Sequence, residues 1–203
     1  MSPPISHSIH LGGSMEPSVN RTDQDVRVPV NREHMRRVMG RFASGVTIIT
    51  TRHEGIDYGL TASAVSSLSL DPPMLLICIN KTSNTQKAIE ASRVFGVNIL
   101  RGNQSEVARR FATSDPDKYT GQSVSYGALG VPLLDDMLAT IECRVTEIVS
   151  GGTHSVFLAE VEAAHAAEGM PLATFRGRLG RFVDLHSQHA AALWRDMQWD
   201  DAA

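Results

Sequence analysis

The sequence predicts a mainly β protein with helical inserts, of the α+β class, whose strands form a closed antiparallel barrel. Three observations predict this class. Runs of β-branched and apolar residues outnumber stretches with helical spacing, alternating segments come in pairs separated by turn residues, and no strand–helix–strand alternation is sustained. A length of 203 residues suits one such domain with a tail at each end.

The overall composition is that of an ordinary globule, with 42% hydrophobic and 20% charged residues. A formal net charge of -3 argues against nucleic-acid binding, since phosphates favour strongly basic surfaces. No apolar run approaches the roughly 18 residues of a membrane span, and the start lacks a secretion signal, so we expect a cytoplasmic protein without membrane contact. Cys78 and Cys143 lie in apolar runs and are expected to be buried free thiols.

The N-terminal region changes character near residue 31. Residues 1–30 hold four prolines and no apolar period, so we expect a disordered or extended arm. An amphipathic helix should follow, with Asn31 as its N-cap and Gly45 as its stop. Its basic face is either solvated or in contact with a ligand or a second subunit. Its apolar side chains are Met35, Val38, Met39 and Phe42.

Two strands flank a stretch rich in hydroxyl groups. Residues 46–51 are β-branched almost throughout, and residues 74–79 form a continuous apolar run that we expect to be buried on both faces. Residues 59–73 between them carry almost no charge, and burying a hydroxyl without a partner costs a few kcal/mol. This stretch is either a surface loop or a ledge of small residues facing a flat polar ligand.

A second polar stretch, residues 80–85, precedes a short helix predicted over residues 86–92. The start of a helix offers free amide donors and the positive end of the helix dipole. The hydroxyls and Lys81 gathered there therefore form a candidate phosphate site. The alternative is simple helix capping, which needs only one of these side chains.

The residue pattern in the middle of the chain predicts a strand, a helix and a long loop. The strand at residues 94–100 contains Asn98, which needs a polar partner if buried. Asn103 should cap the helix that follows. Residues 112–129 indicate an irregular loop of the kind that often lies over a site, where Lys118 and Tyr119 could touch a ligand.

The last third predicts a hairpin, a short strand and a tail. Alternation over residues 137–146 and 155–163 is typical of a half-buried antiparallel hairpin, and residues 172–175 form a third strand-like run. The tail, residues 186–203, should be helical. Its His186 and His189 stand three apart, but no nearby carboxylate or thiol completes a ligand set, so we expect no metal site.

The side chains do not indicate acid–base or nucleophilic catalysis. The sequence has no glycine-rich dinucleotide fingerprint after a strand, no phosphate-loop motif and no Gly-x-Ser-x-Gly elbow. A bound organic cofactor would explain this, because the reactive atoms would then belong to the cofactor.

Three motifs in order resemble the flavin reductase family, the short-chain reductases that partner flavin-dependent monooxygenases. They are MGRFASGVTIITT at residues 39–51, GLTASAVSSLSLDPP at residues 59–73 and NKTSNT at residues 80–85. The resemblance covers about residues 33–182. It implies an FMN-binding split β-barrel of Greek-key-like antiparallel type over residues 31–185, a homodimer, and NAD(P)H-dependent reduction of FMN or FAD.

The resemblance also assigns site residues by position. The isoalloxazine and ribityl region falls to Thr61, Ala62, Ser63, Ser66 and Ser67. The flavin phosphate falls to Asn80, Lys81, Ser83 and Thr85, and Asn98 would lie beside the cofactor. His154 matches the family's histidine near the nicotinamide and is the candidate catalytic residue.

The chain departs from the family pattern around this histidine. Thr153 stands where the family often has Asp, Ala159 where it has Gly, and Leu179 where an aromatic residue is frequent. These departures leave the choice between NADH and NADPH open. The motifs likewise do not decide between FMN and FAD, and they do not identify the partner monooxygenase. Two other functions share the motifs: a flavin carrier or sensor without turnover, and a split-barrel flavoprotein oxidoreductase acting directly on a small substrate.

Overall fold

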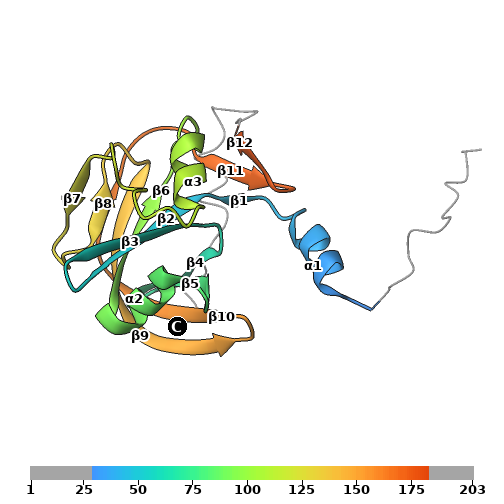
Figure 1. The fold of residues 1–203 in the computed structure, drawn as a ribbon, viewed down its shortest axis with the longest axis horizontal. Coiled ribbons are helices and arrows are strands. Elements are labelled where there is room, and N and C mark those ends of the chain that lie inside the picture. The colour runs from blue at the N-terminus through green and yellow to red at the C-terminus, as the bar shows by residue number, and fades with distance from the viewer. Residues whose placement is uncertain (1–28, 183–203) are drawn as a thin grey trace, which may run out of the picture.

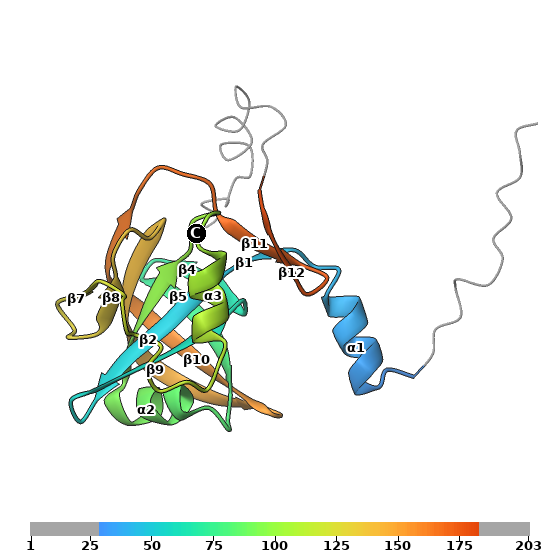
Figure 2. The ribbon, with the colours of Figure 1, turned by 45° about the horizontal axis from the view of Figure 1, so that its top comes forward.

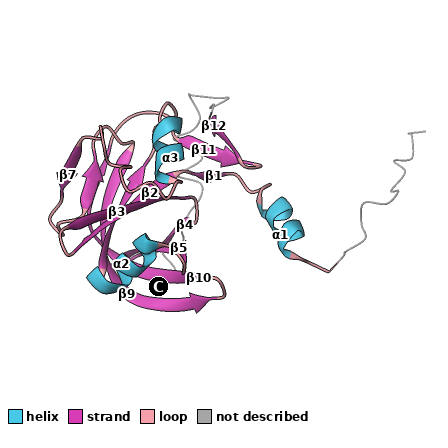
Figure 3. Cartoon of the chain, in the orientation of Figure 1, coloured by secondary structure: helices cyan, strands magenta, loops and turns pink. Residues whose placement is uncertain are grey.

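The computed structural model describes residues 29–182, and strands dominate this part of the chain (Figure 1, Figure 3). The predicted N-terminal arm lies outside the described residues except for its last two positions. The predicted helical tail, with His186 and His189, lies outside them entirely. Within residues 29–182, no helix is long and apolar enough to cross a membrane.

A seven-stranded antiparallel sheet forms the body of the molecule. In spatial order its strands are β3 (Ile56–Ala62), β2 (Thr47–His53), β6 (Val94–Ile99), β9 (Ala139–Gly151), β10 (His154–Ala166), β5 (Pro73–Asn80) and β4 (Val65–Leu70). The prediction of a mainly antiparallel β protein with few helices is therefore confirmed. The strand pairing does not show a closed barrel, because β3 and β4 remain the two edges of this sheet.

The remaining elements surround the sheet. Two small antiparallel sheets comprise β1 (Ser44–Gly45), β11 (Leu172–Phe175) and β12 (Arg178–Arg181), and β7 (Val124–Tyr126) and β8 (Pro132–Leu134). The helices are α1 (Arg32–Met39), α2 (Asn84–Ser92) and α3 (Ser105–Phe111). In two views α2 and α3 lie on either side of β3 (Figure 1, Figure 2). These two helices thus border the sheet edge that carries the hydroxyl-rich stretch.

Helix α1 begins where the sequence predicts but ends earlier. The side chain of Asn31 accepts a hydrogen bond from the His34 amide at 2.8 Å, which confirms the N-cap. The helix ends at Gly40, whose amide donates to Arg36, whereas Gly45 belongs to β1. The helix stands apart from the sheet and buries none of its residues (Figure 2). Its apolar stripe is 51% exposed at Met35, Val38 and Met39, and Phe42 is 72% exposed.

The hydrophobic core lies against one face of each central strand. In β5, buried residues alternate with half-buried ones, so burial on both faces was a wrong prediction. Strand β5 is next to the edge strand β4, and the core covers only its Leu75, Ile77 and Ile79 face. A second cluster, which includes Phe111 and Leu172, packs α3 on the sheet.

Asn98 is the central polar residue of this core. It is 0% exposed, and its amide donates to the Ile48 carbonyl at 3.1 Å and to Thr50 Oγ1 at 3.2 Å. Its carbonyl oxygen accepts the Leu134 amide at 2.8 Å. The polar partner that the sequence required is therefore the protein itself, and Asn98 joins β6 to β2 and β8.

The two cysteines are free thiols in different surroundings. Cys143 is fully buried, as predicted, and burial raises the pKa of its thiol to about 12. Cys78 is only half-buried, because its other side borders a cavity described below. Burial raises the pKa of the Cys78 thiol as well.

The raised pKa of Cys143 predicts a loss of stability in alkali. An unfolded thiol ionises near pH 9.0 while the folded one stays protonated to about 12, so between these values the unfolded state binds fewer protons and stability falls. At pH 10 we expect the free energy of unfolding to drop by about 1.4 kcal/mol from this group. Urea unfolding at pH 8 and pH 10 measures the drop. Cys143→Ala should show a smaller pH difference, and an equal difference would contradict the assignment.

Candidate functional site

A cavity of about 710 Å³ lies beside β3, between the end of β5 and the segment that follows α3. This volume falls in the range of small-molecule and cofactor sites. Seven of the predicted site residues line it: Thr61, Ala62, Ser63, Asn80, Ser83, Thr85 and His154. The fold therefore brings the hydroxyl-rich stretch and the polar helix start to one place.

The other four predicted site residues do not line the cavity. Ser66 and Ser67 are exposed on the edge strand β4. The Lys81 ammonium donates to Ser150 Oγ at 2.7 Å and to the Gly152 carbonyl at 2.8 Å, so it is turned toward the turn between β9 and β10. Asn98 is enclosed in the core, and its side-chain amide is bonded to other protein groups. It is therefore not available to a ligand.

The end of β3 and the residues after it, Thr61 to Ala64, form a wall of small residues. The hydroxyl of Thr61 donates to the Ala108 carbonyl at 2.6 Å and so fixes α3 against the strand. Gly59 allows this close approach, because a Cβ at that position would lie 2.7 Å from the Phe111 ring. The sequence left a surface loop as the alternative for this stretch. Instead it forms two strands, β3 and β4, joined by Ser63 and Ala64.

The start of α2 forms a second wall. The side chain of Asn80 accepts hydrogen bonds from the Thr82 amide and hydroxyl, both at 2.9 Å, and so fixes the turn before the helix. Ser83 is the N-cap, yet its side chain makes no capping bond. Simple capping therefore does not account for this hydroxyl. Because Ser83, Asn84 and Thr85 line the cavity, the helix start is suited to an anionic group.

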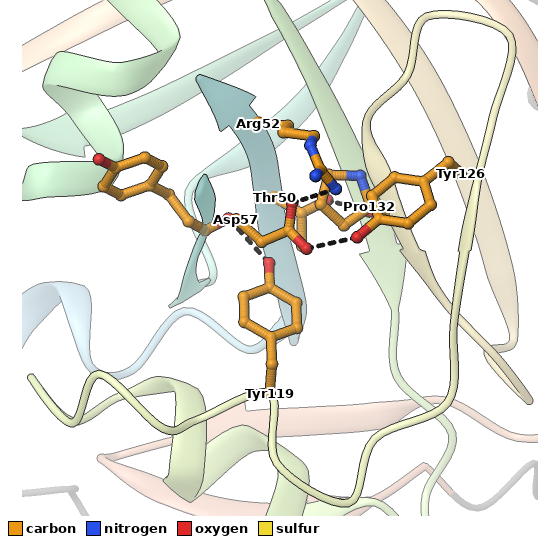
Figure 4. Close-up of polar contacts among 7 residues, drawn as sticks. Thr50, Arg52, Asp57, Tyr119, Tyr126 and Pro132 are labelled. Atoms are coloured by element: carbon orange, nitrogen blue, oxygen red, sulfur yellow. Dashed lines mark hydrogen bonds and ion pairs between the residues drawn. The ribbon is translucent and has the colours of Figure 1, made fainter. Parts of the chain in front are cut away.

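The segment after α3 forms a third wall and is fastened to β3. Tyr119 donates its hydroxyl to the Tyr58 carbonyl at 2.8 Å (Figure 4). Its ring packs edge-on against Phe111, with the centroids 5.0 Å apart. Burial raises the pKa of Tyr119 well above its ordinary value, so the hydroxyl keeps its proton and stays a donor. The predicted loop thus has a fixed position at the cavity.

A charged cluster around Asp57, which lines the cavity, was missed by sequence reasoning. Asp57 accepts a hydrogen bond from the Tyr126 hydroxyl at 2.6 Å and pairs with Arg52 at 3.2 Å (Figure 4). The Arg52 guanidinium lies 4.7 Å from the centre of the Tyr126 ring. The bond to Asp57 raises the pKa of Tyr126. Arg52 and Asp57 are direct cross-strand partners in the β2–β3 hairpin, and that register was the available signal.

His154 is the first residue of β10 and lines the cavity from the side of the helix start. It is exposed and lies opposite Asn80 in the strand register. Its Nδ1 is 2.9 Å from the hydroxyl oxygen of Thr153, so this hydroxyl can orient the ring. The imidazole is therefore available to a ligand at the cavity edge.

Comparisons with known proteins agree on one family. The family described as "Flavin reductase like domain" matches residues 39–182, which include every residue that lines the cavity. A relative from Rhodococcus opacus is 44% identical over 179 residues, covering 88% of this chain and 94% of the relative. That relative is the reductase component of 4-nitrophenol 4-monooxygenase/4-nitrocatechol 2-monooxygenase.

Two solved structures share the fold. The nitrilotriacetate monooxygenase component B homologue from Mycobacterium thermoresistibile has a TM-score of 0.72 and 41% identity, covering 74% of this chain and 86% of that one. The NADH:FAD oxidoreductase SgcE6 of Streptomyces globisporus C-1027 has a TM-score of 0.71 and 34% identity, covering 76% and 94%. The latter structure contains NAD and FAD fragments.

Proposed function

The chain belongs to the flavin reductase like domain family, and we propose that it reduces FMN or FAD with NADH or NADPH and supplies the reduced flavin to a partner monooxygenase. The single observation that carries this proposal is that the small residues of β3 and the free helix start of α2 border one cavity of about 710 Å³. A flat polar ring with an anionic tail suits these two walls.

The residues present fit a bound flavin. Thr61, Ala62 and Ser63 would hold the ring and ribityl region, and the start of α2 would hold the phosphate. When bound, the flavin supplies the ring that accepts hydride from the reduced nicotinamide. The chain's own part is to hold the two ligands in position and exclude water, with His154 at the nicotinamide.

Similarity to reductase components supports a monooxygenase partner, because such a component supplies reduced flavin to another protein. The related structure with NAD and FAD fragments favours NADH over NADPH. We keep FMN and FAD as alternatives, because the cavity does not distinguish them.

We also propose that the seven-stranded sheet is part of an FMN-binding split β-barrel of Greek-key-like type. The free thiols Cys78 and Cys143 favour a cytoplasmic location.

A direct test is to mix the purified protein with each flavin and each pyridine nucleotide and to follow nicotinamide absorbance. We expect oxidation of NADH well above the rate without enzyme. A bound yellow chromophore that neither nucleotide bleaches would indicate a carrier or sensor instead. Reduced flavin that is reoxidised only when a small substrate is added would indicate an oxidoreductase that acts on that substrate directly.

We further propose a homodimer in which a second copy covers the apolar stripe of α1. The stripe is half-exposed or more in the single chain, and the helix stands apart from the sheet. An apolar face of this kind on a projecting helix is typical of an interface.

Val38→Ser combined with Met39→Ser should weaken self-association by at least about 10-fold, because both substitutions remove apolar area from the proposed interface. Light scattering over a concentration series measures the shift from dimer to monomer. Arg37→Ser, on the opposite side of α1, carries a similar cost in helix propensity and should leave the dimer intact. A wild-type monomer, or equal effects of the two changes, would contradict the proposal.

A further inference from the structure

Among residues 29–182, the lining of the cavity holds one permanent positive charge, and it is not the lysine of the polar helix start. That residue is Lys118, the only lysine or arginine in this described lining. The other charged or titratable lining side chains outside the β3 wall are Cys78, Asp115 and His154. On that wall, Asp57 is already paired with Arg52 and Tyr126. Since Lys81 bonds to the β9–β10 turn, attraction of an anion by fixed charge depends on Lys118.

The Lys118 ammonium is held by neutral partners. It donates to the Gly59 carbonyl at 3.2 Å and to the Thr113 carbonyl at 2.7 Å. An ammonium has three donors, so these bonds leave one N–H on a side chain that borders the cavity. No carboxylate lies within salt-bridge distance of Lys118 among residues 29–182. The two carbonyls therefore fix the position of the charge without neutralising it.

The surroundings of Lys118 favour an anionic partner. Burial lowers the pKa of its ammonium, and the charge of Asp115 offsets part of this effect. A half-buried cation that has lost water without gaining a paired anion is stabilised when a ligand brings one.

Lys118 and the start of α2 lie on different walls. Lys118 belongs to the segment after α3 and bonds to β3, whereas the start of α2 follows β5, and α2 and α3 lie on either side of β3 (Figure 1). The cavity therefore offers two separate places for anions. A ligand set with one phosphate would use only one of them.

We propose that Lys118 binds a nucleotide phosphate other than the one held at the start of α2. The inference rests on the proposed function, which supplies ligands with more than one phosphate. Two sources share this chemistry: the adenosine diphosphate half of FAD, and the diphosphate of the nicotinamide nucleotide. FMN, with its single phosphate, does not need Lys118.

The test compares Lys118→Gln, which removes the charge but keeps a donor, with Lys118→Arg, which keeps the charge. Calorimetric titration of each purified full-length protein gives dissociation constants for FMN, FAD and NAD⁺. For Lys118→Gln we expect FAD, NAD⁺ or both to bind about 10-fold more weakly, with FMN changed less than about twofold. Lys118→Arg should stay within about threefold of wild type for all three. Thermal unfolding checks the fold, and Lys118→Met replaces Lys118→Gln if the latter unfolds.

The identity of the weakened ligand shows the source of the phosphate. Loss confined to FAD assigns its adenosine diphosphate half, and loss confined to NAD⁺ assigns the nicotinamide nucleotide. An unchanged set of constants, or an FMN loss as large as the others, would overturn the proposal and leave Lys118 as a brace between β3 and the segment after α3. Wild-type protein that binds these ligands without turnover would instead count against the proposed function alone.

Discussion

Ser63→Phe is expected to weaken binding of both FMN and FAD by at least about 100-fold, which is about 2.7 kcal/mol of binding free energy. Ser63 follows β3, is exposed and lines the cavity between β3 and the start of α2. A phenyl group there would occupy the space of the flat ring, because this wall is built of small residues. The fold should survive, since the new side chain displaces no core residue. Quenching of flavin fluorescence gives the dissociation constants.

A matched control separates this effect from the general cost of an exposed phenylalanine. Ser125 is also an exposed serine, but it lies in β7, away from the cavity lining. Ser125→Phe should leave flavin binding within about twofold of wild type, with thermal unfolding unchanged in both variants. If Ser63→Phe binds flavin as wild type does, the ring does not lie against β3, and the assignment of this cavity to the flavin fails.

The strands were predictable because their signal is local. Alternation with a period of two residues gave the β9–β10 hairpin, and β-branched density gave β2. The errors concern contacts across the fold. Burial of β5 on both faces was wrong, because only its Leu75, Ile77 and Ile79 face meets the core, whereas Cys78 on the other face borders the cavity. Met35, Val38 and Met39 were correctly placed on a helix, whereas Phe42 lies beyond its end. Nothing in the spacing says that the described chain leaves these side chains uncovered.

The cavity was predictable in part for the same reason. The hydroxyl-rich stretch and the polar helix start each have a local signature, and the fold brings them together. The direction of a long side chain has no such signature. Lys81 bonds to Ser150, some 69 residues further along the chain, and that contact turns its charge out of the cavity. Lys118 borders the cavity instead, and its ammonium is held there by bonds to the Gly59 and Thr113 carbonyls.

His154→Ala should lower kcat/KM for NADH by about 10- to 100-fold while changing the flavin dissociation constant less than about threefold. The physical reason is position. His154 lies at the cavity edge beside the start of α2, and it is an exposed residue at the beginning of β10, not part of the wall formed by β3. Steady-state kinetics with varied NADH and saturating flavin measure the first quantity, and fluorescence titration measures the second.

Thr153→Val tests how the imidazole is held. The Thr153 hydroxyl lies 2.9 Å from His154 Nδ1, so its removal frees the ring to rotate but leaves the ring in place. We therefore expect a loss of about threefold in kcat/KM for NADH, well below that of His154→Ala, because one neutral hydrogen bond is worth about 1 kcal/mol or less.

If His154→Ala weakens flavin binding as much as NADH use, the histidine supports the β10 edge of the cavity and does not contact the nicotinamide. If Thr153→Val equals His154→Ala, orientation by this hydroxyl accounts for the whole contribution of the histidine.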